Sequence, residues 1–264
     1  CIRDSISTVV DISKKAVDIE KFKLSSGKIN ANVEGLIKKL NSNNPNLNLT
    51  INVNKSRTED FIALLPPTNV KNIDLNIPAL KKYGLYSDIE GKLRIKGPAD
   101  KPQITGEFIS SNAYIIKPLP SSVSKATVKL TFLGDKLNLD VIVPITSTEK
   151  VTIKGPLELY GDKSADLRVE STQNIDLETT EAILNPVHEI LCFELGPLPV
   201  MNLKGLGNIN LRIKGPKITP ELIGVFNFKN TFGKFNDINM LLENGEGHLY
   251  FEGKQVHFIT NKLF

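Results

Sequence analysis

The chain contains three histidines, a residue type that often binds metals and transfers protons near neutral pH. Two of them, His248 and His257, stand on either side of a turn at Gly253. A structural zinc site needs four ligands in tetrahedral geometry. The nearby carboxylates Glu246 and Glu252 have no spacing that would fix them as ligands. We therefore expect no metal site, and we expect these histidines to lie on the surface of strands.

The two cysteines add little further chemistry. Cys192 stands between Leu191 and Phe193, an apolar setting that favours an inert buried thiol over a nucleophile. Cys1 is either the lipidated end of a mature lipoprotein or the place where a longer chain was cut. The sequence has no nucleophile elbow, phosphate-binding loop or dinucleotide fingerprint, and the acidic pair Glu59-Asp60 is typical of a solvated helix start. The sequence therefore predicts no enzyme, no catalytic residues and no cofactor.

Composition excludes two further classes of protein. The chain has 264 residues, of which 40% are hydrophobic and 23% charged, as in an ordinary folded soluble protein. The net charge is only +4, and no basic face of the kind that binds nucleic acid is apparent. No segment approaches the roughly 18 apolar residues that span a bilayer. We expect no nucleic-acid partner, and any membrane anchor or export signal would lie outside this segment.

The elements that would position any site occur in two copies. The hexapeptide Leu-Arg-Ile-Lys-Gly-Pro stands at 93–98 and again at 211–216, an offset of 118 residues. A Gly-x-Phe triplet follows each copy, at 106–108 and at 224–226. Further matches at offsets of 119 and 120 residues continue in the same order along the chain. Because a chance match would not keep this order, the chain is predicted to contain an internal duplication.

The duplication predicts the domain organisation. A lead-in segment covers 1–26, and its sequence suits a helix or a strand equally well. A first repeat of about 120 residues then covers 27–145 and a second covers 146–264. We expect one short helix in each repeat, at about 57–65 and about 177–191.

Both repeats are predicted to consist mainly of strands, because apolar and polar residues alternate through most of their length. Glycine-containing pairs separate the alternating runs. Gly134-Asp135 and Gly253-Lys254 suit two-residue hairpin turns, and Gly155-Pro156 suits a further turn.

Strict alternation places the apolar side chains of each strand on one face of its sheet. Leaving that face exposed to water would be unfavourable, since burial of apolar surface stabilises the fold by about 25 cal/mol per Å². A second sheet, a closed barrel or a curled open sheet around an apolar ligand could each cover it. The residues alone leave these three alternatives open.

The order of the motifs resembles the repeating unit of the TamB and AsmA-like family. The resemblance rests on a strand that ends in Gly-Pro, a following Pro and a Gly-x-Phe that opens the next strand, present at 93–108 and at 211–226. The helix-and-proline element at 58–66 and the hairpin at 130–137 resemble the same family. In all, the resemblance covers about 27–262.

This resemblance implies a mainly β fold, an elongated sheet curled into a taco-like trough with an apolar interior. It implies a periplasmic protein, anchored to the inner membrane by a segment outside this chain. Phospholipid acyl chains would lie in the trough and move between the inner and outer membranes, or the protein would aid outer-membrane protein assembly with a β-barrel partner. The residues expected to line the lipid groove are Leu93, Ile95, Phe108, Val128, Leu130, Phe132, Leu137, Leu139, Val141, Leu211, Ile213, Phe226, Phe228, Leu249 and Phe251.

Two alternatives remain from the sequence. The first is a structural or adhesive β-repeat module with a dry packed core, in which the same apolar residues need no ligand. The second is an enzyme, which would need a polar cleft with several titratable groups that the sequence does not announce.

Overall fold

A computed structural model of the chain describes residues 5–13, 15–26, 29–64, 77–83, 85–115, 125–172, 174–179, 201–235 and 240–262. Within these residues the chain forms one open antiparallel sheet, and its strands follow one another across the sheet in chain order. The prediction of a mainly β fold is therefore confirmed.

The main path across the sheet contains long strands: β1 (Ser5–Ile12), β2 (Ala16–Ser26), β3 (Ile29–Lys38), β4 (Asn46–Arg57), β6 (Asp88–Pro98), β7 (Gln103–Ile115), β8 (Ala126–Gly134), β9 (Lys136–Pro144), β10 (Lys150–Glu158), β11 (Ala165–Ser171), β13 (Met201–Gly215), β14 (Glu221–Phe235), β15 (Met240–Gly253) and β16 (Gln255–Lys262). Two short strands lie off this path: β5 (Leu85–Tyr86) pairs with β7, and β12 (Ile175–Asp176) pairs with β13. Two short helices, α1 (Thr58–Leu64) and α2 (Ile77–Tyr83), lie between β4 and β5 in the chain.

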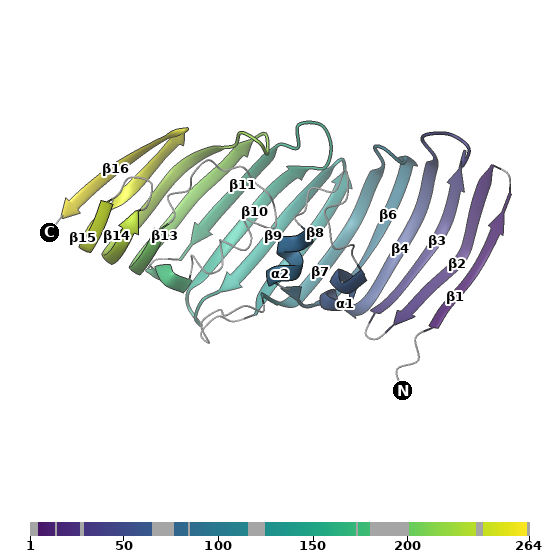
Figure 1. The fold of residues 1–264 in the computed structure, drawn as a ribbon, viewed down its shortest axis with the longest axis horizontal. Coiled ribbons are helices and arrows are strands. Elements are labelled where there is room, and N and C mark those ends of the chain that lie inside the picture. Colours follow the sequence, from purple (N-terminus) through teal and green to yellow (C-terminus); the bar gives the residue numbers. More distant parts are fainter. Residues whose placement is uncertain are drawn as a thin grey trace.

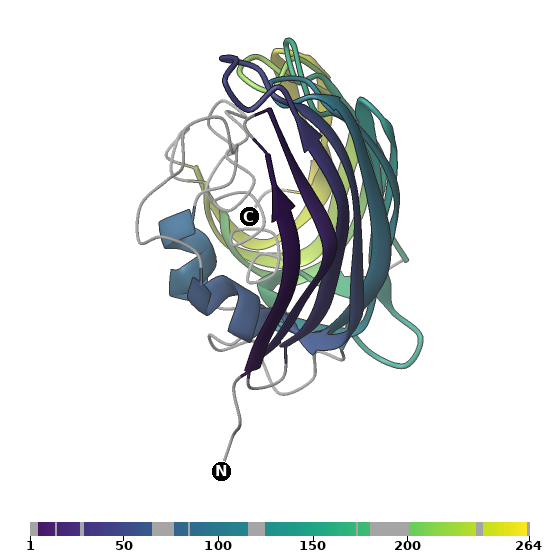
Figure 2. The same cartoon turned by 90° about the vertical axis from the view of Figure 1, so that its right-hand side faces the viewer.

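The sheet is a long curved layer. Figure 1 shows the strands side by side, with β1 at one end of the sheet and β16 at the other. Figure 2 shows that the sheet curls, and that α1 and α2 lie on its concave side. The sheet passes through the predicted repeat boundary at 145–146 without interruption, because β9 pairs directly with β10.

The two predicted hairpins are confirmed. Leu133 pairs with Lys136 around the first turn, and the turn residue Gly134 has a φ of 77°. The second turn has the same form, and its Gly253 has a φ of 64°. Both angles lie in the left-handed region, which glycine enters without a steric penalty.

The predicted turn at Gly155-Pro156 is wrong. Both residues lie inside β10, opposite Leu139 and Asn138 of β9. On the other side of β10, the pairing with β11 is interrupted at these two positions. Because proline has no N–H to donate, a strand can accept it where one side of the pairing is interrupted.

The duplicated Gly-x-Phe motif has a structural reason. Gly106 and Gly224 have φ values of 128° and 129°, a region almost closed to other residues. A Cβ at Gly106 would collide with the backbone oxygen of Lys92, and one at Gly224 with that of Asn210. Each glycine therefore lets the neighbouring strand approach closely.

The two copies also share their pairing register. In each, a leucine, this glycine and a phenylalanine lie opposite one another on three neighbouring strands, as Leu93, Gly106 and Phe132 and as Leu211, Gly224 and Phe251.

The helices and the lead-in differ in part from expectation. The predicted helix at 57–65 is found as α1, but α2 follows it, so the expectation of one helix in the first repeat is wrong. Helix α2 has seven residues, as α1 has, but no acidic residue in its first turn, so it lacks the start signal that Glu59 and Asp60 give α1. The lead-in forms β1 and β2. Of the helix predicted at 177–191, the structure describes a helical turn at 177–179, and the rest lies outside the described residues.

Buried side chains gather mainly in the C-terminal half of the sheet. We call the larger cluster the closed core; it consists of Val143, Ile145, Val151, Ile153, Val169, Ile175, Leu177, Leu203, Ile209, Phe226, Phe228, Leu242, Leu249 and Phe251. A smaller cluster of Ile29, Ala31 and Val53 lies under Phe61 of α1. Among the described helices, none is long and apolar enough to cross a membrane.

Candidate functional site

The sheet has one apolar face, and strand register places every predicted groove residue on it. Side chains that lie directly opposite in an antiparallel sheet share a face. Phe108, Leu130 and Leu139 lie opposite one another on β7, β8 and β9. The same rows continue across β10 and β11 to β13, β14 and β15. The prediction from alternation that these residues share one face of the sheet is therefore confirmed.

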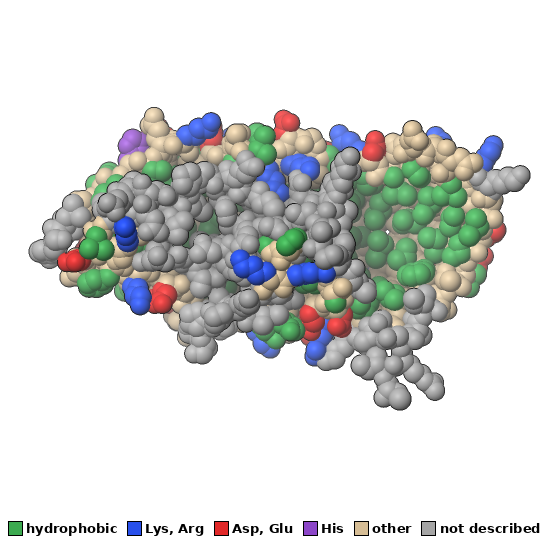
Figure 3. Space-filling view, viewed as in Figure 1, with side chains coloured by type: hydrophobic (Ala, Val, Ile, Leu, Met, Phe, Trp, Pro, Cys, Tyr) green, Lys and Arg blue, Asp and Glu red, His purple; other side chains and the backbone are tan. Residues whose placement is uncertain are grey.

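This apolar face is the concave one. Figure 3 shows a hollow near the β1 end of the sheet, and its surface is covered with hydrophobic side chains. The charged side chains that are visible in this view lie outside the hollow.

In the N-terminal half, the apolar face is only partly covered. Many of its inward side chains on the strands from β2 to β9 are half-buried, and we call the surface that they form the open floor. The open floor consists of Phe22, Leu24, Val33, Leu49, Ile51, Ile95, Phe108, Val128, Leu130, Phe132, Leu137, Leu139 and Val141. Leu93 lies among them but is more deeply buried, at 9% exposure.

In the C-terminal half, the same face is packed. Phe226, Phe228, Leu249 and Phe251 are between 2% and 5% exposed and belong to the closed core. Leu211 and Ile213 are half-buried and pack against the closed core. The predicted groove residues of the second repeat therefore line a filled interior in this structure.

Sequence reasoning missed the part of the open floor nearest the N-terminus. Phe22 and Leu24 lie on β2, in the lead-in that the sequence did not assign, and Val33 lies on β3. Leu49 and Ile51 belong to a run whose alternation is clear in the sequence, and that alternation was the signal for including them.

The convex face carries ion pairs. Arg212 binds Asp166 through two nitrogen–oxygen contacts of 2.6 Å each. The hydrogen bonds from Arg212 hold the pKa of the Asp166 carboxyl below its ordinary value. On the same face, Lys154 lies 3.2 Å from Asp140. The sheet therefore separates an ionic face from an apolar face.

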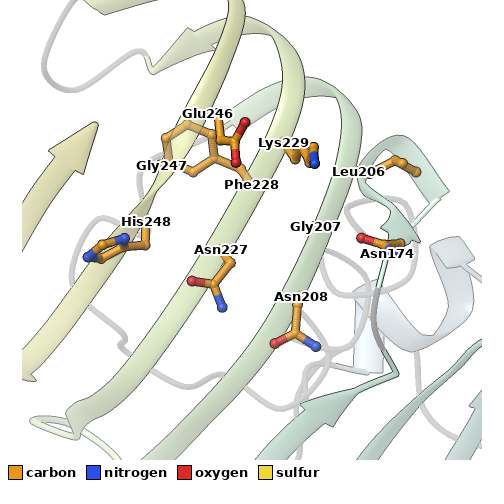
Figure 4. Close-up of a pocket in the computed structure, with 10 residues that line it drawn as sticks. All are labelled: Asn174, Leu206, Gly207, Asn208, Asn227, Phe228, Lys229, Glu246, Gly247 and His248. Carbon is orange, nitrogen blue, oxygen red and sulfur yellow. The ribbon is translucent and has the colours of Figure 1, made fainter. Parts of the chain in front are cut away.

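A polar depression of about 220 Å³ lies on the convex side of β13, β14 and β15. Figure 4 shows Asn208, Asn227 and His248 side by side on these strands. The Asn208 side-chain amide donates to the backbone oxygens of Ser171 and Thr172. The hydrogen bonds of Asn208 therefore connect the end of β11 to β13, which gives this depression a structural role.

The residues first considered for chemistry do not converge. The imidazole of His257 lies 3.9 Å from Glu252 on the convex side, and His248 lies in the polar depression on the same side. In the described part of the chain, no group of three or more metal-binding side chains comes together. Cys192 lies outside the described residues.

No protein-family model, curated protein or solved structure matches this chain.

Proposed function

We propose that this chain is a segment of a TamB/AsmA-like envelope protein, whose curled sheet holds phospholipid acyl chains and passes them between the inner and outer membranes. The observation that carries the proposal is the open floor. Its half-buried apolar side chains continue across consecutive strands from β2 to β9 on the concave side of one sheet. A contiguous apolar surface that is left partly exposed is typical of a site that binds an apolar ligand.

The proposed mechanism is physical rather than chemical. An acyl chain that moves from a bilayer onto the open floor stays out of water, and each CH₂ kept dry contributes about 0.8 kcal/mol. Phe108 and Phe132 form an edge-to-face pair with ring centroids 6.4 Å apart, so the floor is built from ordinary hydrophobic contacts. The lipid headgroup would stay at the open side of the curl, in water.

The two-repeat, taco-like arrangement is part of this proposal. It is supported by the shared register of the two Gly-x-Phe motifs and by the curvature of the sheet in Figure 2. We place the protein in the periplasm with its anchor outside this chain, as the family resemblance suggests. A role in outer-membrane protein assembly fits the same resemblance.

One observation favours a second candidate, a structural β-repeat module with a dry core. The closed core is packed in the way that such a module requires, with Phe228 stacked on Phe258 at a centroid distance of 5.7 Å. This candidate explains the C-terminal half of the sheet and leaves the open floor without a role.

Lipid carried through purification separates the two candidates. The chain would be purified from bacterial membranes in mild detergent, and bound lipid would be measured by native mass spectrometry and lipid extraction. The test variant replaces Leu130 and Phe132, which face inward, by Asp. Its matched control replaces the flanking outward residues Thr131 and Leu133 by Asp; Leu133 is 55% exposed.

The proposal predicts phospholipid on the wild-type chain and on the outward control, and its loss from the inward variant. Circular dichroism would establish that both variants keep their strands. A stable, lipid-free wild-type chain would instead support the structural module.

A further inference from the structure

Beyond the open floor, a short piece of chain lies beside β13 and places a side chain over its concave face. After β11, the chain makes the two-residue strand β12 and then a helical turn at 177–179. The N–H of Thr179 donates to the Asp176 carboxylate at 2.8 Å, which fixes this turn as a helix cap would.

Two side chains of this piece fill the concave side of β13. Ile175 lies opposite Gly207 in the sheet and is fully buried, at 0% exposure. Leu177 is 3% exposed, and it occupies the space in front of Gly207, because a Cβ there would collide with its side chain. Glycine at 207 therefore makes room for Leu177.

Ile175 and Leu177 belong to the closed core, which reaches from Val143 on β9 to Phe251 on β15. Val141, the last part of the open floor on β9, already packs against this cluster. The apolar face is therefore continuous along the sheet, but its side chains change from half-buried in the open floor to buried in the closed core.

We propose that Ile175 and Leu177 form a plug that makes the groove blind-ended, so that acyl chains bind from β2 to β9 and stop at the closed core. This inference rests on the proposed function and adds the limit of its binding site. The seven strands from β2 to β9 along the path extend about 29 Å at the usual strand spacing of about 4.8 Å. One leaflet of a bilayer is about 15 Å of hydrocarbon, so the groove accepts a full acyl chain lengthwise.

Tryptophan fluorescence can map where lipid reaches, because the chain contains no tryptophan of its own. Single tryptophans would replace Phe132 in the open floor, Phe226 in the closed core and Tyr250 on the convex face. Each would be made with Leu177 present and with Leu177→Ala. The probe is phosphatidylcholine brominated along its acyl chains, which quenches a tryptophan only on contact, presented in vesicles.

With Leu177 present, the proposal predicts quenching at Phe132→Trp and none at Phe226→Trp or Tyr250→Trp. With Leu177→Ala, quenching should extend to Phe226→Trp while the Tyr250→Trp signal stays unchanged. Quenching of Phe226→Trp with Leu177 in place, or no change on removing Leu177, would overturn the plug and leave the proposed function standing. Unquenched Phe132→Trp would overturn both.

A second measurement covers the case in which Phe226→Trp with Leu177→Ala does not fold. Native mass spectrometry would count the lipids bound by Leu177→Ala and by Leu177→Met, whose side chain fills a similar volume. The plug predicts more lipid on the alanine variant and the wild-type amount on the methionine variant. Equal lipid on the two variants would contradict it.

Discussion

Phe132 on β8 and Phe251 on β15 occupy matching places in the two copies of the sequence motif, and their surroundings differ. Each lies opposite the glycine of its Gly-x-Phe motif. Phe132 is half-buried, whereas Phe251 is 3% exposed within the closed core. Phe108 and Phe226 differ in the same sense, so one motif serves an open surface in one half and a packed interior in the other.

The difference shows that strand pairing and burial have separate causes in this sheet. Register follows from the alternation and the glycines, and around the duplicated motif it is the same in both halves. Burial follows from what lies over the concave face: Phe61 of α1 covers a small cluster in the first half, and Leu177 lies over Gly207 in the second. Leu93 and Leu211 reverse the trend, since Leu93 is the more buried of the two.

Truncating the matching phenylalanines should give the largest effect. Phe251→Ala removes a buried ring and should lower the free energy of unfolding by about 3–5 kcal/mol. Phe132→Ala removes a half-buried ring and should lower it by only about 1 kcal/mol, roughly half of what full burial of such a side chain contributes. Urea unfolding followed by circular dichroism would measure both free energies. Equal losses in the two variants would contradict the difference in burial between the two phenylalanines.

Lipid should stabilise the chain through the open half alone. A ligand that binds only the folded state at about a hundredfold excess over its Kd raises the free energy of unfolding by about 2.7 kcal/mol. We expect this gain for wild type and for Phe251→Ala, and its loss when Leu130 and Phe132 are replaced by Asp. Urea unfolding with and without phospholipid would measure it. A gain that disappears in Phe251→Ala would place the ligand in the wrong half.

The two motif glycines should behave alike, unlike the phenylalanines beside them. Gly106→Ala and Gly224→Ala each force a side chain into a conformation that is strained by about 1–3 kcal/mol, and each adds a collision with the neighbouring strand. The thermal unfolding midpoints of the two variants should therefore fall by similar amounts. A large difference between the two falls in midpoint would show that the two glycines do not relieve the same strain, although their register is the same.

The ion pair on the convex face should give the smallest effect. Because the folded-state pKa of Asp166 is lowered by Arg212, the pair stabilises the fold above the unfolded pKa, near 4. That contribution is lost as pH falls through the folded value, and it is small because the pair is partly exposed. Asp166→Asn should therefore weaken the fold slightly at pH 7, and the difference from wild type should vanish in strong acid.

The first half offers the matched control for this pair. Asn48 lies opposite Lys96 as Asp166 lies opposite Lys214, so the first half has no carboxylate at this place. Asn48→Asp should add a small, acid-sensitive stabilisation. A stability difference that does not depend on pH would contradict the assignment.

The sequence predicted which side chains share a face of the sheet better than it predicted where strands end. Alternation around Leu93 and Leu130 sufficed to place side chains on the concave side, and glycine at 134 and 253 marked the hairpins. The turn predicted at Gly155-Pro156 is wrong. A strand accepts a proline where one neighbouring strand does not pair with it, and the sequence does not show which neighbour that is.

The division between open and filled halves could not be predicted from the sequence. It depends on contacts between distant segments, such as Leu177 with Gly207, and the strand patterns of the two halves do not encode them. Nor did alternation identify β1, in which Val9 and Val10 are adjacent and a register shift falls between them.

The most direct test of the central claim is to label the unaltered chain with a phospholipid that carries a photoreactive group on its acyl chain. Peptide mass spectrometry would then locate the attached lipid. The account predicts adducts on the inward residues of the open floor, such as Leu49, Phe108 and Leu130, and none on the convex residues beside them. Adducts confined to the convex face, or an unlabelled open floor, would contradict it.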